Sequence, residues 1–466
     1  MRKTLFAAVL ALGALSCRIP YPDSPAYHPE SLGGDPARRE LTRPEDLPPA
    51  APVPPPSATM TLDDCLRTAL QNNRRVWIAD RRILITKDRI DEALSQLLPR
   101  LTADAAVTWR NNDQGFSAMG MEIVMGERTR STARLGLIVP IYDFGRAQAQ
   151  MGAEGHRVEA VEKEAERSLQ ELSFAISVAY FRLLEARKIR DVVQESIRLV
   201  TLQSRIAQDF LSQGLVARSD VLSAEVQLAD RQQTLIRAEN NIRLARATLN
   251  RLMGVDLQRP TELVDVFEAL PWNGPLETAL KLAIDRRPDL AAFRRMVEVG
   301  RAEYDVIRRG NLPGIVGVAG YNYTSDEATI NKDWMDASVL LQIPLVDGFN
   351  TQFRLKRKKK EIAEAIDFHD EKLDDILLDV NLAWLQVRDS AERLPVARKS
   401  IDLAEENLRV MRDQYVAGLV STADMLIEED RLSQARSNHI RALYDCHSSA
   451  ARLVNATGGP LPKEQP

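Results

Sequence analysis

Apolar residues recur at alternating intervals of four and three along residues 172–211, the spacing of a coiled-coil seam. Ten of the twelve positions are apolar, the exceptions being Arg190 and Ser204. The twelve are Leu172, Ile176, Ala179, Leu183, Ala186, Arg190, Val193, Ile197, Val200, Ser204, Ala207 and Leu211. We expect one continuous helix over residues 146–211, about 100 Å long at about 1.5 Å per residue. The equivalent stretch in the second half of the chain predicts another long helix over residues 351–415.

A glycine turn and a second heptad pattern follow each long helix. In the first half the apolar positions recur every seven residues, at Val221, Leu228, Leu235, Ile242 and Leu249. The matching positions in the second half are Met425, Leu432, His439, Cys446 and Leu453. Because the connecting turn is short, the two helices must be antiparallel neighbours. Each half therefore predicts a coiled-coil helical hairpin.

The two halves of the chain are related by a duplication. Gly214-Leu215-Val216-x-x-x-Asp220 matches Gly418-Leu419-Val420-x-x-x-Asp424 at an offset of 204 residues, as does Val139-Pro140 with Ile343-Pro344. Nearer the start of each half, Leu98-Pro99 matches Leu312-Pro313 at an offset of 214. Residues 60–255 are thus repeated at residues 274–459, and the second copy lacks ten residues between these motifs.

Two stretches ahead of each long helix alternate in side-chain character, which predicts strands. Residues 101–110, 132–141 and 334–343 alternate clearly, and residues 315–323 less so. Each is about ten residues, the length that a tilted strand needs to cross a bilayer. We expect the odd-numbered side chains to face lipid; a soluble sheet packed on the helices is the alternative. Four strands cannot close a barrel alone, so several chains would be needed.

Composition narrows the class of protein further. The net charge is −4, with 27% charged and 5% aromatic residues, which disfavours nucleic-acid binding and favours long helices. The five histidines are scattered, and the sequence has no HExxH, P-loop, GxSxG or Cys/His metal pair. We therefore expect no enzyme activity, no catalytic or metal-binding residue and no cofactor.

The N-terminus has the features of an exported precursor. Arg2 and Lys3 precede an apolar run at residues 5–15, which is too short to span a bilayer. The run ends Ala14-Leu15-Ser16-Cys17, which resembles a bacterial lipobox and predicts lipidation of Cys17. Cleavage by an ordinary signal peptidase is the alternative. Residues 18–58 hold twelve of the 24 prolines and predict an extended linker.

Two further cysteines, Cys65 and Cys446, allow two interpretations. Export makes a disulfide chemically possible. However, Cys446 occupies an apolar position of the heptad pattern, which favours a buried free thiol.

The ordered set of motifs resembles the TolC-like outer membrane efflux protein family. The residues that carry the resemblance are the opening Thr61-Leu62-x-x-Cys65-Leu66-x-x-Ala69-Leu70-x-Asn72-Asn73, the Leu-Pro before each first strand, the Pro-x-x-Asp after each second strand and the paired Gly-Leu-Val-x-x-x-Asp turns. It covers about residues 60–459. With the lipobox, the chain is similar to the lipoproteins that serve resistance-nodulation-division pumps. The expected parts are residues 1–17 (signal peptide), 18–58 (linker), 59–256 (first repeat) and 274–459 (second repeat).

The resemblance implies a fold and a function. The fold is mainly α with a small β part: duplicated long helical hairpins and four membrane strands per chain, closed by a homotrimer into an α/β-barrel duct. The function is a passive exit duct of a tripartite efflux or secretion system, anchored in outer membrane lipid. Its partners would be a periplasmic adaptor and an inner membrane pump. The alternative from the coiled-coil pattern alone is a periplasmic scaffold or adaptor that never enters the membrane.

The resemblance also assigns roles to the turns. Asp424 would line a periplasmic gate with Asp220; the family's second gate acid is Ile427 here, and Glu428 could substitute for it. The alternative is simple helix capping, because Ser421-x-x-Asp424 matches a capping box. Adaptor-docking tips would comprise Gly214, Leu215, Val216, Gly418, Leu419 and Val420. We expect positive φ at the two glycines and exposure of the other four residues; packing within the hairpin is the alternative.

Six basic residues follow the last strand: Arg354, Lys356, Arg357, Lys358, Lys359 and Lys360. If that strand lies in a bilayer, these side chains would lie near the headgroups of the inner leaflet. A solvated helix face is the alternative.

Overall fold

The computed structural model describes residues 59–112, 114–119, 121–126, 128–266, 272, 274–326 and 329–460, all within the unit Val53–Pro466. Cys17 and the proline-rich segment lie outside these residues. The first half contains α2 (Leu62–Asn72), α3 (Arg74–Ser95), α4 (Arg146–Ser212) and α5 (Arg218–Met253). The second half repeats them as α6 (Leu276–Arg286), α7 (Pro288–Arg309), α8 (Asn350–Val416) and α9 (Thr422–Ala456). Both long helices match the expected bounds within a residue.

Four antiparallel strands form one sheet in the order β2-β5-β7-β8. They are β2 (Arg100–Trp109), β5 (Thr129–Tyr142), β7 (Gly314–Thr324) and β8 (Asp333–Gln342), as the alternation predicts. The sequence did not indicate two smaller pairs. β1 (Thr59–Met60) pairs in parallel with β6 (Glu262–Leu263), and β3 (Gln114–Ala118) forms a hairpin with β4 (Met121–Gly126). That hairpin lies between β2 and β5, and the described residues show no counterpart between β7 and β8. It accounts for the change of offset from 214 to 204.

The register of the sheet places the odd-numbered residues on one face. Leu137 pairs with Leu101 on one side and with Ala319 on the other, and Ala319 pairs with Ala337. The opposite face is more polar: Asp104 pairs with Arg134, Arg134 with Asn322 and Asn322 with Trp334. A bulge between Pro140 and Tyr142 ends this alternation near the helices. The alternation read from the sequence therefore corresponds to two faces of different chemistry.

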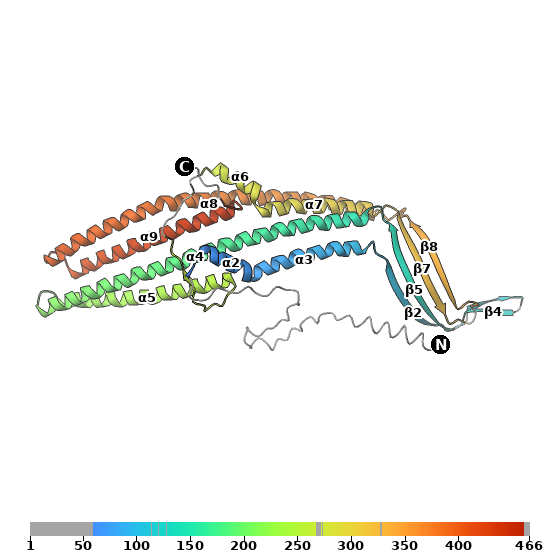
Figure 1. Ribbon diagram of the computed structural model, residues 1–466, viewed down its shortest axis with the longest axis horizontal. Helices are drawn as coiled ribbons and strands as arrows, with labels where there is room; N and C mark the ends of the chain where they lie inside the picture. The colour runs from blue at the N-terminus through green and yellow to red at the C-terminus, as the bar shows by residue number, and fades with distance from the viewer. Residues whose placement is uncertain are drawn as a thin grey trace. The chain divides into compact units, whose positions relative to one another are not determined.

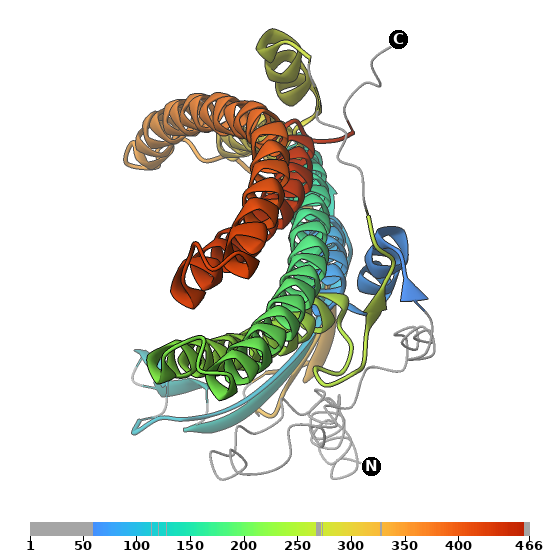
Figure 2. The same ribbon diagram turned by 90° about the vertical axis from the view of Figure 1, so that its left-hand side faces the viewer.

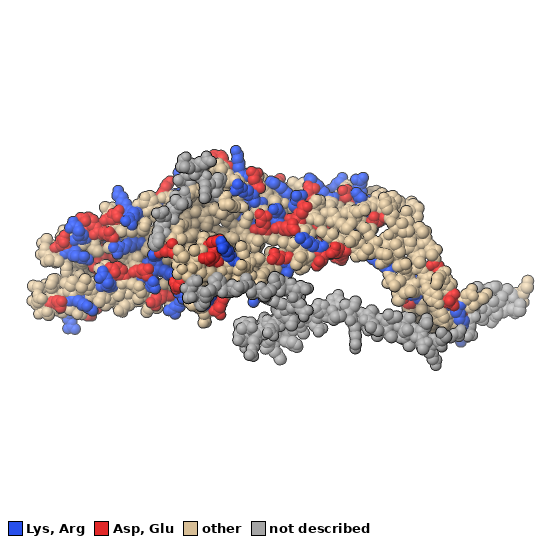
Figure 3. Space-filling view, in the orientation of Figure 1, with Lys and Arg blue, Asp and Glu red and all other residues tan. Residues whose placement is uncertain are grey.

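The helices form a continuous wall in which α4 is central. Beside the sheet, α4 packs between α3 and α7, and α7 packs on α8. Farther from the sheet, α4 packs on α5 and α9, and α9 packs on α8. Figures 1 and 2 show this arrangement, with the turns of both hairpins at the end opposite the sheet. Charged side chains cover the helices, whereas the visible face of the sheet is mostly uncharged (Figure 3). No helix among the described residues is both long and apolar enough to cross a membrane.

The heptad seams form the core of the helical wall. In the first half, Leu172, Ile176, Leu183 and Leu249 are fully buried together with Cys65. In the second half the corresponding cluster contains Ile376, Val380, Ala383, Val387 and Leu453.

Cys65 and Cys446 are both buried free thiols, so the prediction of unpaired cysteines is confirmed. Burial raises the pKa of Cys65 to about 12, which keeps it protonated and unreactive.

Candidate functional site

Both hairpin turns are closed by a glycine in the left-handed conformation. Gly214 has φ +72° and Gly418 has φ +74°, values that L side chains rarely adopt. At the first turn the Leu215 N–H donates to the Phe210 carbonyl (2.9 Å); at the second the Leu419 N–H donates to the Gln414 carbonyl (2.9 Å). These bonds satisfy carbonyls at the ends of α4 and α8, as in a Schellman motif. The expected positive φ is confirmed at both glycines.

The apolar residues after each glycine differ in exposure. Leu215 is 66% exposed and Leu419 is 75% exposed, as expected of a surface available to a partner. Val216 and Val420 are only half-buried, so the expectation of four exposed residues was wrong for the valines. Val420 packs against the cluster of Tyr415, Met425 and their neighbours, because the turn folds it back onto its own hairpin.

The two aspartates cap the returning helices. The Asp424 Oδ2 accepts from the Ser421 N–H (3.0 Å) and from the Ser421 hydroxyl (2.7 Å), and the Asp424 N–H donates to the Ser421 Oγ (3.2 Å). These bonds hold the pKa of Asp424 below its ordinary value. The Asp220 Oδ2 accepts from the Ala217 N–H (3.0 Å), but alanine offers no acceptor in return. The capping role is confirmed, and the gate role stays a prediction.

Glu428 lies within the second hairpin and does not point freely into solvent. Its carboxylate is nearly buried and accepts hydrogen bonds from Asn407 of α8 and from Arg431, one turn farther along α9. Ile427 is half exposed on the same turn of the helix. The gate role of Glu428 therefore stays a prediction. Its carboxylate already accepts hydrogen bonds from two side chains.

Near the tips, the two hairpins are joined by contacts that the sequence did not suggest. A small cluster contains Val200 of α4, Ala224 of α5 and Leu426 of α9. Arg231 of α5 forms an ion pair with Asp430 of α9. Glu429 of α9 is 5% exposed, and burial raises its pKa to about 7 even though Arg412 and Arg231 lower it. The sequence pattern did not predict this burial, because a polar residue such as Glu429 is expected on the exposed side of a heptad repeat.

A buried ionic cluster joins four helices in the middle of the wall. Arg287, at the start of α7, donates to both carboxylate oxygens of Asp289, to Asp379 of α8 and to the carbonyl of Ala456 in α9. Arg167 of α4 donates to Asn455 beside it. Burial alone would raise the pKa of Asp289, but the hydrogen bonds and charge of Arg287 hold it below its ordinary value. The cluster fixes how the helices meet.

The basic segment of α8 is divided between two environments. Lys358 is mostly buried and forms ion pairs with Glu303 of α7 and with Glu361. Arg354, Lys356 and Lys360 are exposed. Neither of the two expectations, contact with lipid headgroups or a solvated helix face, fits all six residues. Lys358 is the exception, because it points back toward α7.

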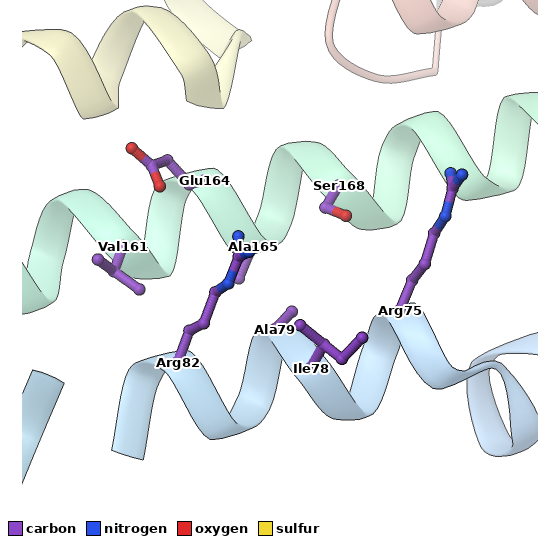
Figure 4. A pocket seen from close by; sticks show the side chains of 8 residues that line it. All are labelled: Arg75, Ile78, Ala79, Arg82, Val161, Glu164, Ala165 and Ser168. Carbon is purple, nitrogen blue, oxygen red and sulfur yellow. The ribbon is translucent and has the colours of Figure 1, made fainter. Parts of the chain in front are cut away.

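A groove of about 260 Å³ lies between α3 and α4. Arg75 and Arg82 of α3 line it together with Glu164 and Ser168 of α4 (Figure 4). In the described part of the chain, no group of three or more His, Cys, Asp or Glu residues is placed to hold a metal ion.

Duplicated helical hairpins joined to a four-stranded sheet with one apolar face are the architecture expected of an outer membrane channel. The chain belongs to the outer membrane efflux protein family, whose model matches residues 65–255 and 279–459. It is 26% identical over 338 residues to the alkaline protease secretion protein AprF of Pseudomonas aeruginosa, covering 68% of each chain. It is 22% identical over 404 residues to SilC of Salmonella typhimurium, a probable outer membrane lipoprotein, covering 84% of each. The fold matches the CmeC outer membrane channel of Campylobacter jejuni with a TM-score of 0.73, at 16% identity and 87% coverage of each chain.

Family and fold together establish the function. The protein is an exit duct in the outer membrane and serves a tripartite efflux or secretion system. The alternative of a periplasmic scaffold outside the membrane is not supported.

Proposed function

We propose that the duct is a homotrimer anchored through Cys17, with Asp424 at its gate. The hairpin tips would form the docking surface for a periplasmic adaptor, and an inner membrane pump would be the third component of the system. The observation that carries the trimer is the pair of open sheet edges. β2 and β8 are the edge strands, and each has one edge whose backbone groups pair with no other strand among the described residues. In a bilayer such groups must find partners, so the edges of neighbouring copies would pair.

Strand direction supports this closure. Each strand is antiparallel to its neighbour, so β2 and β8 run in opposite directions. β8 of one copy can therefore pair with β2 of the next without breaking the antiparallel order. Three copies, the number implied by the family resemblance, supply twelve strands.

The outer helices support assembly as well. α8 exposes a row of large apolar side chains on the side away from its own hairpin: Leu378, Leu385, Val396, Leu403 and Val410. α5, at the other margin of the wall, exposes Leu222, Val226, Ile236 and Leu244. Unpaired apolar rows on both margins of one chain suit packing between copies, because burial removes these side chains from water.

The gate can be separated from helix capping by two substitutions. Asp424→Asn removes the charge and keeps an acceptor for the Ser421 N–H, whereas Asp424→Ala removes both. If a carboxylate ring narrows the duct, both variants should raise conductance in a planar bilayer and weaken cation preference. If Asp424 only caps α9, Asp424→Ala should cost about 1 kcal/mol or less of helix stability, and neither variant should change conductance. Asp220→Ala and Glu428→Gln extend the same measurement to the other two gate residues.

The docking surface rests on the exposed leucines of the two turns. Replacing Leu215 and Leu419 by serine should weaken capture of the adaptor by the assembled channel. Val420→Ala removes apolar area that is partly packed inside the hairpin, and so serves as the comparison. Equal losses for the leucine and valine variants would contradict docking through the exposed leucines.

The lipid anchor rests on the lipobox and on similarity to SilC, a probable outer membrane lipoprotein. Labelled palmitate should enter the natural chain and not Cys17→Ser. Equal labelling of both chains would exclude anchoring through this residue. Because residue 18 is arginine, we expect sorting to the outer membrane.

A further inference from the structure

The helices α3 and α8 lie at opposite margins of the wall beside the sheet, with α4 and α7 between them (Figure 1). α3 packs on α4 through Ala79, Thr86 and Ala93, which are buried. α8 packs on α7 through Thr351 and Lys358, among others. Among the described residues, the opposite face of each helix therefore has no packing partner beside the sheet.

Each of these outward faces carries a row of four exposed charged residues. On α3 the row is Arg74, Arg81, Asp88 and Asp91; on α8 it is Lys356, Lys360, Asp367 and Asp374. The intervals of seven, seven and three, and of four, seven and seven, keep each row on one side of its helix. Among the described residues, no ion pair involves any of the eight. With increasing distance from the sheet, the charges in the α8 row change from positive to negative. The charges in the α3 row change from negative to positive.

The duplication predicts how the α8 row of one copy would align with the α3 row of the next copy. α3 corresponds to α7 at an offset of 214, and α4 corresponds to α8 at an offset of 204. Within the chain, Arg157 of α4 pairs with Glu303 of α7, and Glu159 pairs with Arg295. Applied to the next copy, the offsets place positions 361 and 363 of α8 level with positions 89 and 81 of α3.

We infer that α8 of one copy packs on α3 of the next as α4 packs on α7 within the chain. This antiparallel register brings together Lys356 with Asp91, Lys360 with Asp88, Asp367 with Arg81 and Asp374 with Arg74. All four pairs have opposite charge, although nothing in the duplication requires that. The inference rests on the proposed homotrimer and specifies which surfaces of this chain form its contacts.

The order of charges also selects the register. Sliding α8 by one heptad in one direction places Lys360 opposite Arg81, and sliding it in the other places Asp367 opposite Asp88. Both shifts bring like charges together, which is how natural interfaces exclude wrong arrangements. Exposed ion pairs contribute little affinity individually, so their effect here is to fix the alignment of neighbouring copies.

Cysteine pairs test the register in the full-length protein in detergent. Asp88→Cys with Lys360→Cys should give covalent oligomers on oxidation, seen on a non-reducing gel. Because α3 and α8 of one chain are not in contact, the bond must join two copies. The control is Asp88→Cys with Asp374→Cys, which uses the same helices at positions about 21 Å apart in this register. Cys65 and Cys446 are buried and stay in both variants.

The outcomes separate the register from the assembly. Cross-linking of the matched pair alone supports the inference. A trimer that forms without this cross-link, or one that cross-links equally in the control, overturns the register and leaves the homotrimer in place. A natural chain that stays monomeric by light scattering overturns both proposals.

Charge exchange gives an independent test. Asp88→Lys and Lys360→Glu should each lower the fraction of assembled protein several-fold, and the two together should restore it. Asp88→Lys combined with Asp374→Lys is the mismatched control and should not recover assembly. A matched double variant no better than either single variant would contradict the inferred pairs.

Discussion

Glu429→Gln is expected to stabilise the second hairpin at pH 8 and to have little effect at pH 5. Glu429 lies on α9 and is 5% exposed, and its Oε2 has no hydrogen-bond partner among the described residues. The nearby charges come from Arg412 of α8 and Arg231 of α5, and Arg231 is already paired with Asp430. The carboxylate is therefore buried with incomplete compensation.

The direction of the effect follows from proton binding. Burial raises the pKa of Glu429 from its ordinary 4.5 to about 7. Between these values the folded chain holds a proton that the unfolded chain has lost, so stability falls as the pH rises from 4.5 to 7. The difference corresponds to about 3 kcal/mol at pH 8. Glutamine removes the charge but buries an amide, so the expected net gain is about 1–3 kcal/mol.

The assay is thermal unfolding of the full-length protein, followed by circular dichroism at pH 5 and pH 8. Glu428→Gln is the matched control, because the Glu428 carboxylate has partners in Asn407 and Arg431 and its loss should destabilise the hairpin. A gain for Glu429→Gln that is the same at both pH values would refute the reasoning, as would a loss at pH 8.

Three further predictions rest on other parts of the structure. Leu137→Arg should reduce assembled protein in the outer membrane more than Ile138→Arg, because a charge on the lipid face costs roughly 2–4 kcal/mol; equal yields would argue against the assigned faces. Arg287→Ala should lower the free energy of unfolding by about 2–4 kcal/mol in denaturant titrations, since it removes every direct hydrogen bond from Arg287 to the mostly buried Asp289 and leaves the charge of that carboxylate only the longer ion pairs with Arg167 and Lys372; a loss below about 1 kcal/mol would contradict this. Gly254→Ala should destabilise the protein more than Gly214→Ala in the same titration, because both have positive φ but only at Gly254 would a Cβ lie 2.5 Å from a backbone oxygen.

The elements that the sequence predicted well are those with a local period. The spacing that begins at Leu172 repeats every three or four residues, and the alternation around Leu137 repeats every two. Each pattern therefore predicts its helix or strand from the residues of that segment alone. The duplication strengthened both, because each feature appeared twice at a fixed offset. The tip glycines were predictable for the same reason, since a turn between two helices needs positive φ.

The features that were missed depend on contacts between distant residues. Asn73 separates α2 from α3: its side chain accepts from the Arg75 N–H and donates to the carbonyl of Leu252, 179 residues away. The short pairing of β1 with β6 joins the start of the first repeat to its end. Arg287 and Glu429 lie in positions whose burial depends on helices from elsewhere in the chain. The periodicity of one segment cannot show which distant helices will pack against it.

The duplicated tips are alike in backbone and different in chemistry. An offset of 204 relates Glu428 and Glu429 to Ala224 and Glu225. In the first hairpin, Ala224 is buried without a charge and Glu225 is exposed. In the second hairpin, both acids are buried. The free energy that holds the second hairpin together therefore changes with pH between about 4.5 and 7, whereas this turn of the first hairpin buries no group that titrates. At this turn, the two copies of the hairpin therefore differ in their sensitivity to protonation.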